Sequence, residues 1–71
     1  MIPITIHSET IKLGQMLKLA TAVESGSHAK IVIQGGEVKV NGETETRRGR
    51  QLRHGDLVRF AGMEYTVQQA S

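Results

Sequence analysis

The arginine side chains of this sequence are concentrated in one short stretch. All five arginines lie between residues 47 and 59, and half of the residues from 47 to 54 are arginine, with no acid among them. A guanidinium group presents a planar fork of donors that matches the oxygens of a phosphate group, and it also stacks on bases. In a chain whose net charge is only +2, such a local cluster is typical of a surface that binds a phosphate polymer.

A second interpretation of this stretch stays open. Surface segments are often charged simply because they are solvated. Glu43 and Glu45 lie close enough in the sequence to pair with Arg47 and Arg48. In that case the arginines would stabilise the fold and would not bind a ligand.

The other residue types give no support for catalysis or metal binding. The chain has no cysteine, so it has neither a disulfide nor a reactive thiolate. The histidines, His7, His28 and His54, lack carboxylate or cysteine neighbours at metal-ligand spacing. No nucleophilic side chain has a base beside it. We therefore expect a non-enzymatic protein with no cofactor and no bound metal.

Length and composition limit the architecture. With 71 residues, the chain is expected to form one domain, residues 1–71. Its hydrophobic content of 38% permits a thin aliphatic core, whereas 3% aromatic residues are too few for a platform that stacks single-stranded bases. No segment approaches the roughly 20 apolar residues of a membrane helix, and the first residues lack the pattern of an export signal. We expect a monomer in the cytoplasm.

The first half of the chain predicts one strand and two helices. Residues 3–7 alternate apolar and polar side chains, which is typical of a strand. Ser8–Thr10 offer a helix cap, and apolar residues then recur on one helical face: Leu13, Met16, Leu17, Ala20 and Val23. Ser25 or Ser27 is the expected cap of a second helix, which the pair Gly35-Gly36 would end.

A hairpin is predicted after the second helix. Residues 37–40 alternate as a strand does, and Asn41-Gly42 is the strongest turn dipeptide in the chain. A two-residue turn there would place Glu43 and Glu45 on the same face as two inward valines. We therefore expect a looser turn, or a short arm that leaves the core after Gly42.

The remaining elements complete an α+β fold. Residues 47–55 are expected to form an irregular loop that Leu52 anchors in the core. Residues 57–60 and 63–67 each read as strands, with a turn between them. The order of elements predicts two helices packed on a small, mainly antiparallel sheet.

Three short motifs together resemble a known family. They are Ser27-His28-Ala29-Lys30 on the second helix, Val38-Lys39-Val40-Asn41-Gly42 at the hairpin, and Gly55-Asp56-Leu57-Val58 before the last strands. This pattern resembles the S4 RNA-binding domain, and the run from Val40 to Asp56 is similar to that of small stand-alone S4-like proteins of bacteria. The resemblance covers about residues 4–68. It implies the αL motif, in which two helices form an L on a small sheet, with RNA as the ligand.

The resemblance also implies a set of contact residues. The family's RNA surface runs along the second helix, the strand after it and the following loop, which here hold Lys30, Lys39, Asn41, Arg47, Arg48, Arg50 and Arg53. Where the family often has Arg-Leu-Asp, this chain has Lys12-Leu13-Gly14, so Lys12 and Lys18 are weaker candidates. Structured RNA, with ribosomal RNA as one candidate, is the expected partner, and it would be read through its phosphates and shape.

Three other classes of function stay open. A minor-groove or general DNA binder would use the same cations, and the residues themselves do not indicate a preference for the 2′-hydroxyl. A protein-interaction adaptor would use the same basic loop to bind an acidic partner or the protein surface of the ribosome. A β-grasp sulfur carrier has a similar size, but it needs a C-terminal Gly-Gly for thiocarboxylation. This sequence ends in Gln68-Gln69-Ala70-Ser71, which counts against the sulfur carrier.

Overall fold

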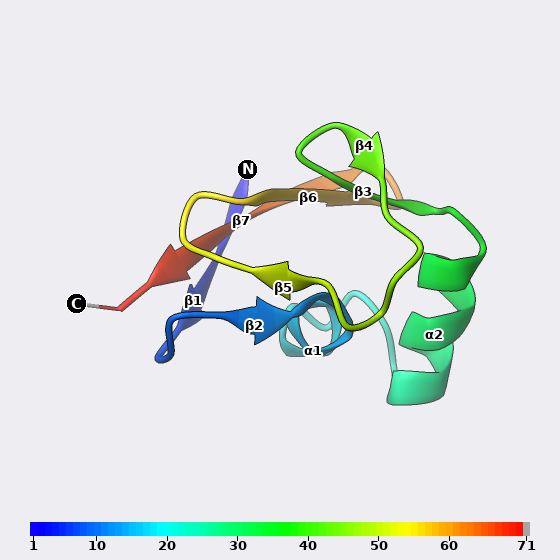
Figure 1. Cartoon of the computed structure of the whole chain (residues 1–71), viewed down its shortest axis with the longest axis horizontal. Coiled ribbons are helices and arrows are strands. Elements are labelled where there is room, and N and C mark those ends of the chain that lie inside the picture. The colour runs from blue at the N-terminus through cyan, green and yellow to red at the C-terminus, as the bar shows by residue number, and fades with distance from the viewer. Residues whose placement is uncertain (71) are drawn as a thin grey trace.

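Two helices lie on one side of a five-stranded sheet, and a small two-stranded sheet leads into the first helix (Figure 1). The computed structural model describes residues 1–70. The α+β architecture expected from the sequence is confirmed. In chain order the elements are β1 (Ile2–Ile6), β2 (Ile11–Lys12), α1 (Leu13–Leu19), α2 (Gly26–Gln34), β3 (Val38–Val40), β4 (Glu43–Thr44), β5 (Gln51–Leu52), β6 (Leu57–Phe60) and β7 (Met63–Gln69).

The larger sheet is mixed but mainly antiparallel. Its strand order is β1-β7-β6-β3-β4, and β1 runs parallel to β7 while the other pairs are antiparallel. The Ile6 carbonyl accepts a hydrogen bond from the Ala70 N–H at 2.8 Å, so the backbone groups of Ile2, Ile4 and Ile6 point toward β7. Pro3 therefore faces the free edge, where its missing N–H breaks no ladder bond and discourages pairing with another chain.

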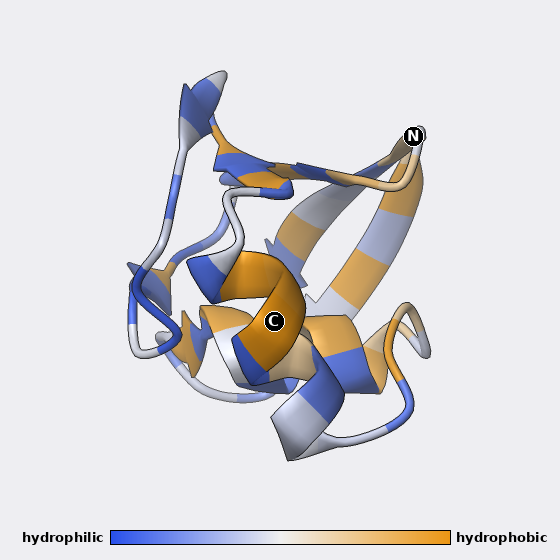
Figure 2. Ribbon diagram, turned by 90° about the vertical axis from the view of Figure 1, so that its right-hand side faces the viewer, coloured by the Kyte–Doolittle hydropathy of each residue, from blue (hydrophilic) through white to orange (hydrophobic). Residues whose placement is uncertain are grey.

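The core lies between the larger sheet and the helices. Alternate residues of the strands face it, as Val38 and Val40 do on β3, while Lys39 and Arg59 face the side without helices. Figure 2 shows this alternation along the strands and both helices on the same side of the sheet. The buried hydrophobic residues are Ile4, Ile6, Leu13, Met16, Leu17, Val23, Ala29, Val32, Ile33, Val38, Val40, Leu52, Val58, Phe60, Tyr65 and Val67.

The first helix begins differently from the sequence prediction. Lys12 is its N-cap and no side chain caps it, while the Ser8 hydroxyl donates to the Thr10 carbonyl at 2.7 Å. The capping role predicted for Ser8–Thr10 is therefore wrong. The residues just before the helix pair instead with β5, since Ile11 lies opposite Leu52. Leu52 is fully buried, so it anchors the 47–55 segment as expected, but it does so from a short strand.

The first helix also ends earlier than the apolar spacing predicts. It stops at Leu19, and Thr21 adopts a left-handed φ of 55°. The Ala22 N–H then donates to the Leu17 carbonyl at 3.0 Å, which closes the helix end. Val23 is still buried, but it reaches the core from the turn after the helix.

The second helix has the expected caps. Ser25, one of the two predicted caps, accepts a hydrogen bond on its hydroxyl oxygen from the His28 N–H at 3.1 Å. At the other end Gly36 has a φ of 77°, and the Glu37 N–H donates to the Val32 carbonyl at 3.1 Å. This arrangement requires the left-handed conformation that glycine adopts without strain.

The hairpin after β3 has a tight turn, so the expectation of a looser one is wrong. Asn41 and Gly42 have φ values of 52° and 86°, and Val40 pairs with Glu43 across a two-residue connection. The Glu45 N–H donates to the Val38 carbonyl at 2.9 Å, so the register continues one step beyond β4. The chain then leaves the sheet, which agrees with a short arm.

Candidate nucleic-acid interface

Glu45 is the buried charged residue of the part of the chain that the structure describes, with 7% of its surface exposed. Its Oε2 accepts from the N–H and the Nε–H of Arg47, each at 3.1 Å. Its Oε1 accepts from Arg50 Nη1 at 2.8 Å and from Arg47 Nη2 at 3.2 Å. The bonds from Arg47, followed by those from Arg50, outweigh burial and lower the pKa of the Glu45 carboxyl from 4.5 to about 2.

These ion pairs show which arginines of the stretch stabilise the fold, and so which of the two interpretations, stabilisation or ligand binding, applies to each residue. Arg47 and Arg50 both neutralise Glu45, and the structural interpretation therefore holds for part of the cluster. The pairing differs in detail, because Arg50 and not Arg48 is the second partner. The Arg47 side chain remains 74% exposed and that of Arg50 35% exposed, so both still present donors to solvent.

The loop that carries these arginines lies across the start of α1. The Arg50 carbonyl accepts from the Leu13 N–H at 2.8 Å, and the Arg48 carbonyl accepts from the Gly14 N–H at 3.1 Å. These loop carbonyls satisfy helix donors that a side-chain cap would otherwise take. A Cβ on Gly14 would lie 2.9 Å from the Arg48 Cγ, so glycine permits this close approach. The loop and the first helix therefore form one unit.

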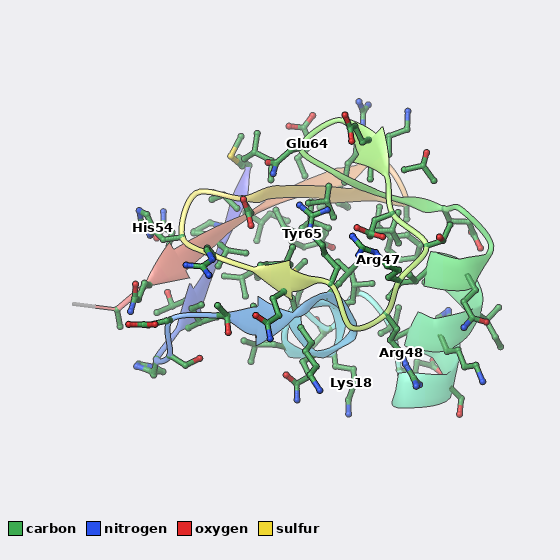
Figure 3. The ribbon with its side chains drawn as sticks, viewed as in Figure 1. Lys18, Arg47, Arg48, His54, Glu64 and Tyr65 are labelled. Atoms are coloured by element: carbon green, nitrogen blue, oxygen red, sulfur yellow. The ribbon has the colours of Figure 1, made fainter. Side chains whose placement is uncertain are left out.

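A cleft of about 330 Å³ opens between α1, the N-terminal end of α2 and this loop. Its cationic lining residues are Lys12, Lys18 and Arg48, and Gln15 adds an amide. The remaining lining residues are small: Gly14, Gly26, Ala29 and Gly49. Figure 3 shows Arg48 extending from the loop toward α2, with Lys18 on the same lower side of the molecule. No carboxylate lines the cleft, so its electrostatic potential favours an anion.

The cations of this cleft are not neutralised within the protein. Among residues 1–70, the ion pairs within 4.0 Å are the two that Glu45 makes. Lys12, Lys18 and Arg48 therefore keep their full charges available to a ligand. The sequence predicts Lys12 and Lys18 as weaker candidates, because Lys12-Leu13-Gly14 departs from the family's Arg-Leu-Asp. The structure places both beside the arginine loop, because the loop crosses the start of α1. One feature of the sequence does point to Lys18: it lies three and four residues after Gln15 and Gly14, which places all three on one face of the helix.

Asn41 holds two turns together. Its Oδ1 accepts from the Leu57 N–H at 3.0 Å, and its Nδ2 donates to Asp56 Oδ1 at 3.2 Å. Asp56 Oδ2 in turn accepts from the Arg53 N–H at 2.8 Å. The amide of Asn41 is thus used inside the protein, which gives a structural reason for the Asn-Gly and Gly-Asp motifs to occur together. Its contact with RNA stays a prediction.

The other predicted contact residues lie on different faces. Lys30 is exposed on α2, one helical turn after Gly26, so it flanks the cleft. Lys39 lies on the side of the sheet without helices. Arg53 is exposed between β5 and β6. Of the predicted contact residues, Arg48 lines the cleft. Arg47 and Arg50 belong to the same loop but pair with Glu45, and Lys39 lies apart from them.

Within residues 1–70, no group of three or more His, Cys, Asp or Glu side chains is arranged to hold a metal ion. No helix in this part of the chain has the length and apolarity needed to cross a bilayer.

Comparison with known proteins agrees with this architecture. A model of the S4 domain family matches residues 4–68. The chain belongs to the S4 domain family. The resemblance drawn from the three sequence motifs is therefore confirmed, and with it the two-helix αL arrangement on a mainly antiparallel sheet.

The S4 domain described here has relatives in well-studied bacteria. It is 50% identical over 60 residues to the "Probable ribosome maturation protein RlbA" of Bacillus subtilis strain 168, covering 84% of each chain. It is 46% identical over 57 residues to the "Putative RNA-binding protein YbcJ" of Escherichia coli K12, covering 80% of this chain and 81% of YbcJ.

Solved structures show the same fold. The solution structure of YbcJ from E. coli, described as having an αL motif involved in RNA binding, superposes with a TM-score of 0.71 at 38% identity. The match covers 96% of this chain and 87% of YbcJ. The crystal structure of ribosomal protein S4e from Thermoplasma acidophilum has a TM-score of 0.64 at 21% identity, covering 83% of this chain and 31% of S4e. At that identity the likeness concerns the fold alone.

Proposed function

We propose that this S4 domain binds structured RNA and catalyses no reaction. The observation that carries the proposal is the cleft beside the arginine loop, because its three cations have no carboxylate partner and no acid lines it. The names of the two bacterial relatives support the same ligand class, since one refers to RNA binding and the other to ribosome maturation. Ribosomal RNA is accordingly the proposed target, and a monomer in the cytoplasm is the proposed form.

The binding mode follows from the side chains available. The RNA-facing surface consists of Lys12, Lys18, Lys30, Arg47, Arg48 and Arg50. Guanidinium and ammonium groups contact phosphates, which position the RNA but carry no sequence information themselves. The single Phe and single Tyr of the chain are both buried, so no exposed aromatic ring is available to stack bases. Recognition therefore depends on backbone geometry and on 2′-hydroxyl groups.

The test is the salt dependence of binding, measured by fluorescence anisotropy with labelled stem–loops of ribosomal RNA. If about five phosphates are contacted, log affinity should fall with log salt at a slope of roughly −4. Arg48→Ala should reduce the magnitude of that slope by about 1. Arg59→Ala is the matched control, because Arg59 is an exposed arginine on the side of the sheet without helices.

Three results would contradict the proposal. One is a folded protein that shows no affinity for RNA at low salt. Another is a larger loss from Arg59→Ala than from Arg48→Ala, which would move the contact to the opposite side of the sheet. A third is capture of an acidic protein partner that persists after nuclease treatment, with no direct RNA affinity, which would favour the adaptor function.

A further inference from the structure

The geometry points to a more specific ligand for the cleft: a single unpaired nucleotide that projects from a structured RNA. This inference rests on the RNA binding proposed above and names the RNA feature that enters the site. Paired bases in an A-form helix are stacked and cannot enter a narrow cleft, whereas a bulged nucleotide is free to leave the stack. Three features of the cleft favour such a ligand: its size, its small lining residues and its polar rim.

The size of the cleft matches a small ligand. Its volume of about 330 Å³ lies at the lower end of the roughly 300–1,000 Å³ typical of small-molecule sites. Such a space suits one nucleotide and is too small for two. Its lining residues come from three segments: α1 with Lys12 before it, the arginine loop and the N-terminal half of α2.

Two glycines of the cleft have no structural reason to be glycine. Gly26 and Gly49 lack the positive φ found at Gly36, and an added Cβ at either position would meet no atom within 4 Å. A glycine costs conformational entropy on folding, and in a helix it is less favourable than alanine. Both glycines line the cleft, so a large side chain at either position would reduce its open volume. The absence of both side chains keeps that volume open for a ligand.

The rim supplies the groups that a nucleotide needs. Arg48 lies with its stem against Gly14, and a guanidinium plane can stack on a base where no aromatic ring is available. Lys12 and Lys18 provide cations for the phosphates on either side of the nucleotide. The Gln15 side-chain amide offers both a donor and an acceptor for a base edge. Together these groups fit a nucleotide better than an isolated phosphate.

The experiment compares a short, fully paired RNA duplex with the same duplex carrying one bulged nucleotide, using each of the four bases in turn. Wild-type protein should bind a bulged duplex about tenfold more tightly than the paired one, because the bulged base gains one stacking contact in the cleft that a paired base does not make. Gly26→Leu, which narrows the cleft, should abolish this preference, so that the variant binds the bulged and the paired duplex equally. Ser27→Leu is the matched control, because Ser27 is exposed on the same turn of α2 and does not line the cleft.

Several outcomes separate this inference from the proposed function. Equal, salt-dependent affinity for bulged and paired duplexes would overturn the nucleotide site and leave RNA binding intact, whereas no affinity for either would overturn both. If Gly26→Leu fails to fold, as judged by circular dichroism, Gly49→Leu fills the same cleft from the loop. Mixed ribonucleoside monophosphates serve as competitors. Displacement of the paired and the bulged duplex alike by free nucleotides would refute a site specific to a bulge.

Discussion

Replacing Glu45 with Gln should destabilise the fold, because it removes the anion that Arg47 and Arg50 share. The substitution keeps the size of the side chain and leaves two arginines without a counter-charge. A pKa lowered from 4.5 to about 2 corresponds to at most about 3 kcal/mol of stabilisation at neutral pH. The Arg47 side chain is 74% exposed, so solvent screening reduces the expected loss to about 1–2 kcal/mol.

The pH dependence of stability identifies the cause of this loss. Since the folded-state pKa of Glu45 lies below its ordinary value, its contribution is fully present above pH 4.5 and disappears as the pH falls through about 2. The difference between wild type and Glu45→Gln should therefore be largest at neutral pH and shrink toward pH 2. Wild type should lose stability across this range more steeply than the variant.

Urea unfolding followed by circular dichroism, at a series of pH values, measures this difference. In a thermal melt, the same loss of about 1–2 kcal/mol would lower the melting temperature of a domain of this size by roughly 4–16 °C. Glu43→Gln is the control, because Glu43 is exposed on β4 and makes no ion pair within 4.0 Å in the described part of the chain. Equal stability of wild type and Glu45→Gln at neutral pH, or a difference that persists unchanged at pH 2, would refute the role assigned to the ion pairs.

Two further predictions separate structural from binding residues. Arg47→Ala should lower the melting temperature, because it removes an ion-pair partner of buried Glu45, whereas Arg48→Ala should leave the melting temperature nearly unchanged. Thermal melts of both variants check this, and equal losses would show that the arginines are not divided in this way. Asn41→Ala should cost about 1–3 kcal/mol, since it removes two hydrogen bonds and places alanine at a φ of 52°. The RNA affinity of this variant, measured below its melting temperature, should stay within about twofold of wild type, which is the size of a small surface effect. A larger loss of affinity would indicate that Asn41 contacts RNA directly.

Features of the sequence with strong local signals were predicted well. The helix that begins after Ser25 and ends at the paired glycines depends on a cap and on a left-handed glycine, both of which act within a few residues. The strand with Val38 and Val40 facing inward depends on simple alternation. Local physics of this kind can be read from residue types because the interacting groups are neighbours in the sequence.

The predictions that failed depend on contacts between distant segments. The start of α1 is satisfied by the carbonyls of Arg48 and Arg50, more than 30 residues further along the chain, and nothing near Ser8 indicates this. A looser hairpin turn is predicted from the sequence, because a tight one places Glu43 and Glu45 on the same face as two inward valines. The burial of Glu45 is tolerated since Arg47 and Arg50 neutralise it, and a buried carboxylate without such partners would be costly.

The residues at the centre of two family motifs, Asn41-Gly42 and Gly55-Asp56, are not the cations that line the cleft. Asn41 and Asp56, at the centre of the two most recognisable motifs, bond to each other and so preserve the relative position of two turns. The cations of the cleft belong to α1 and to the arginine loop, outside those motifs. A chain that kept the first set and replaced Lys18 and Arg48 with neutral residues should therefore keep the S4 fold, because neither side chain is buried or paired. It should lose the cationic lining on which the proposed RNA contact depends.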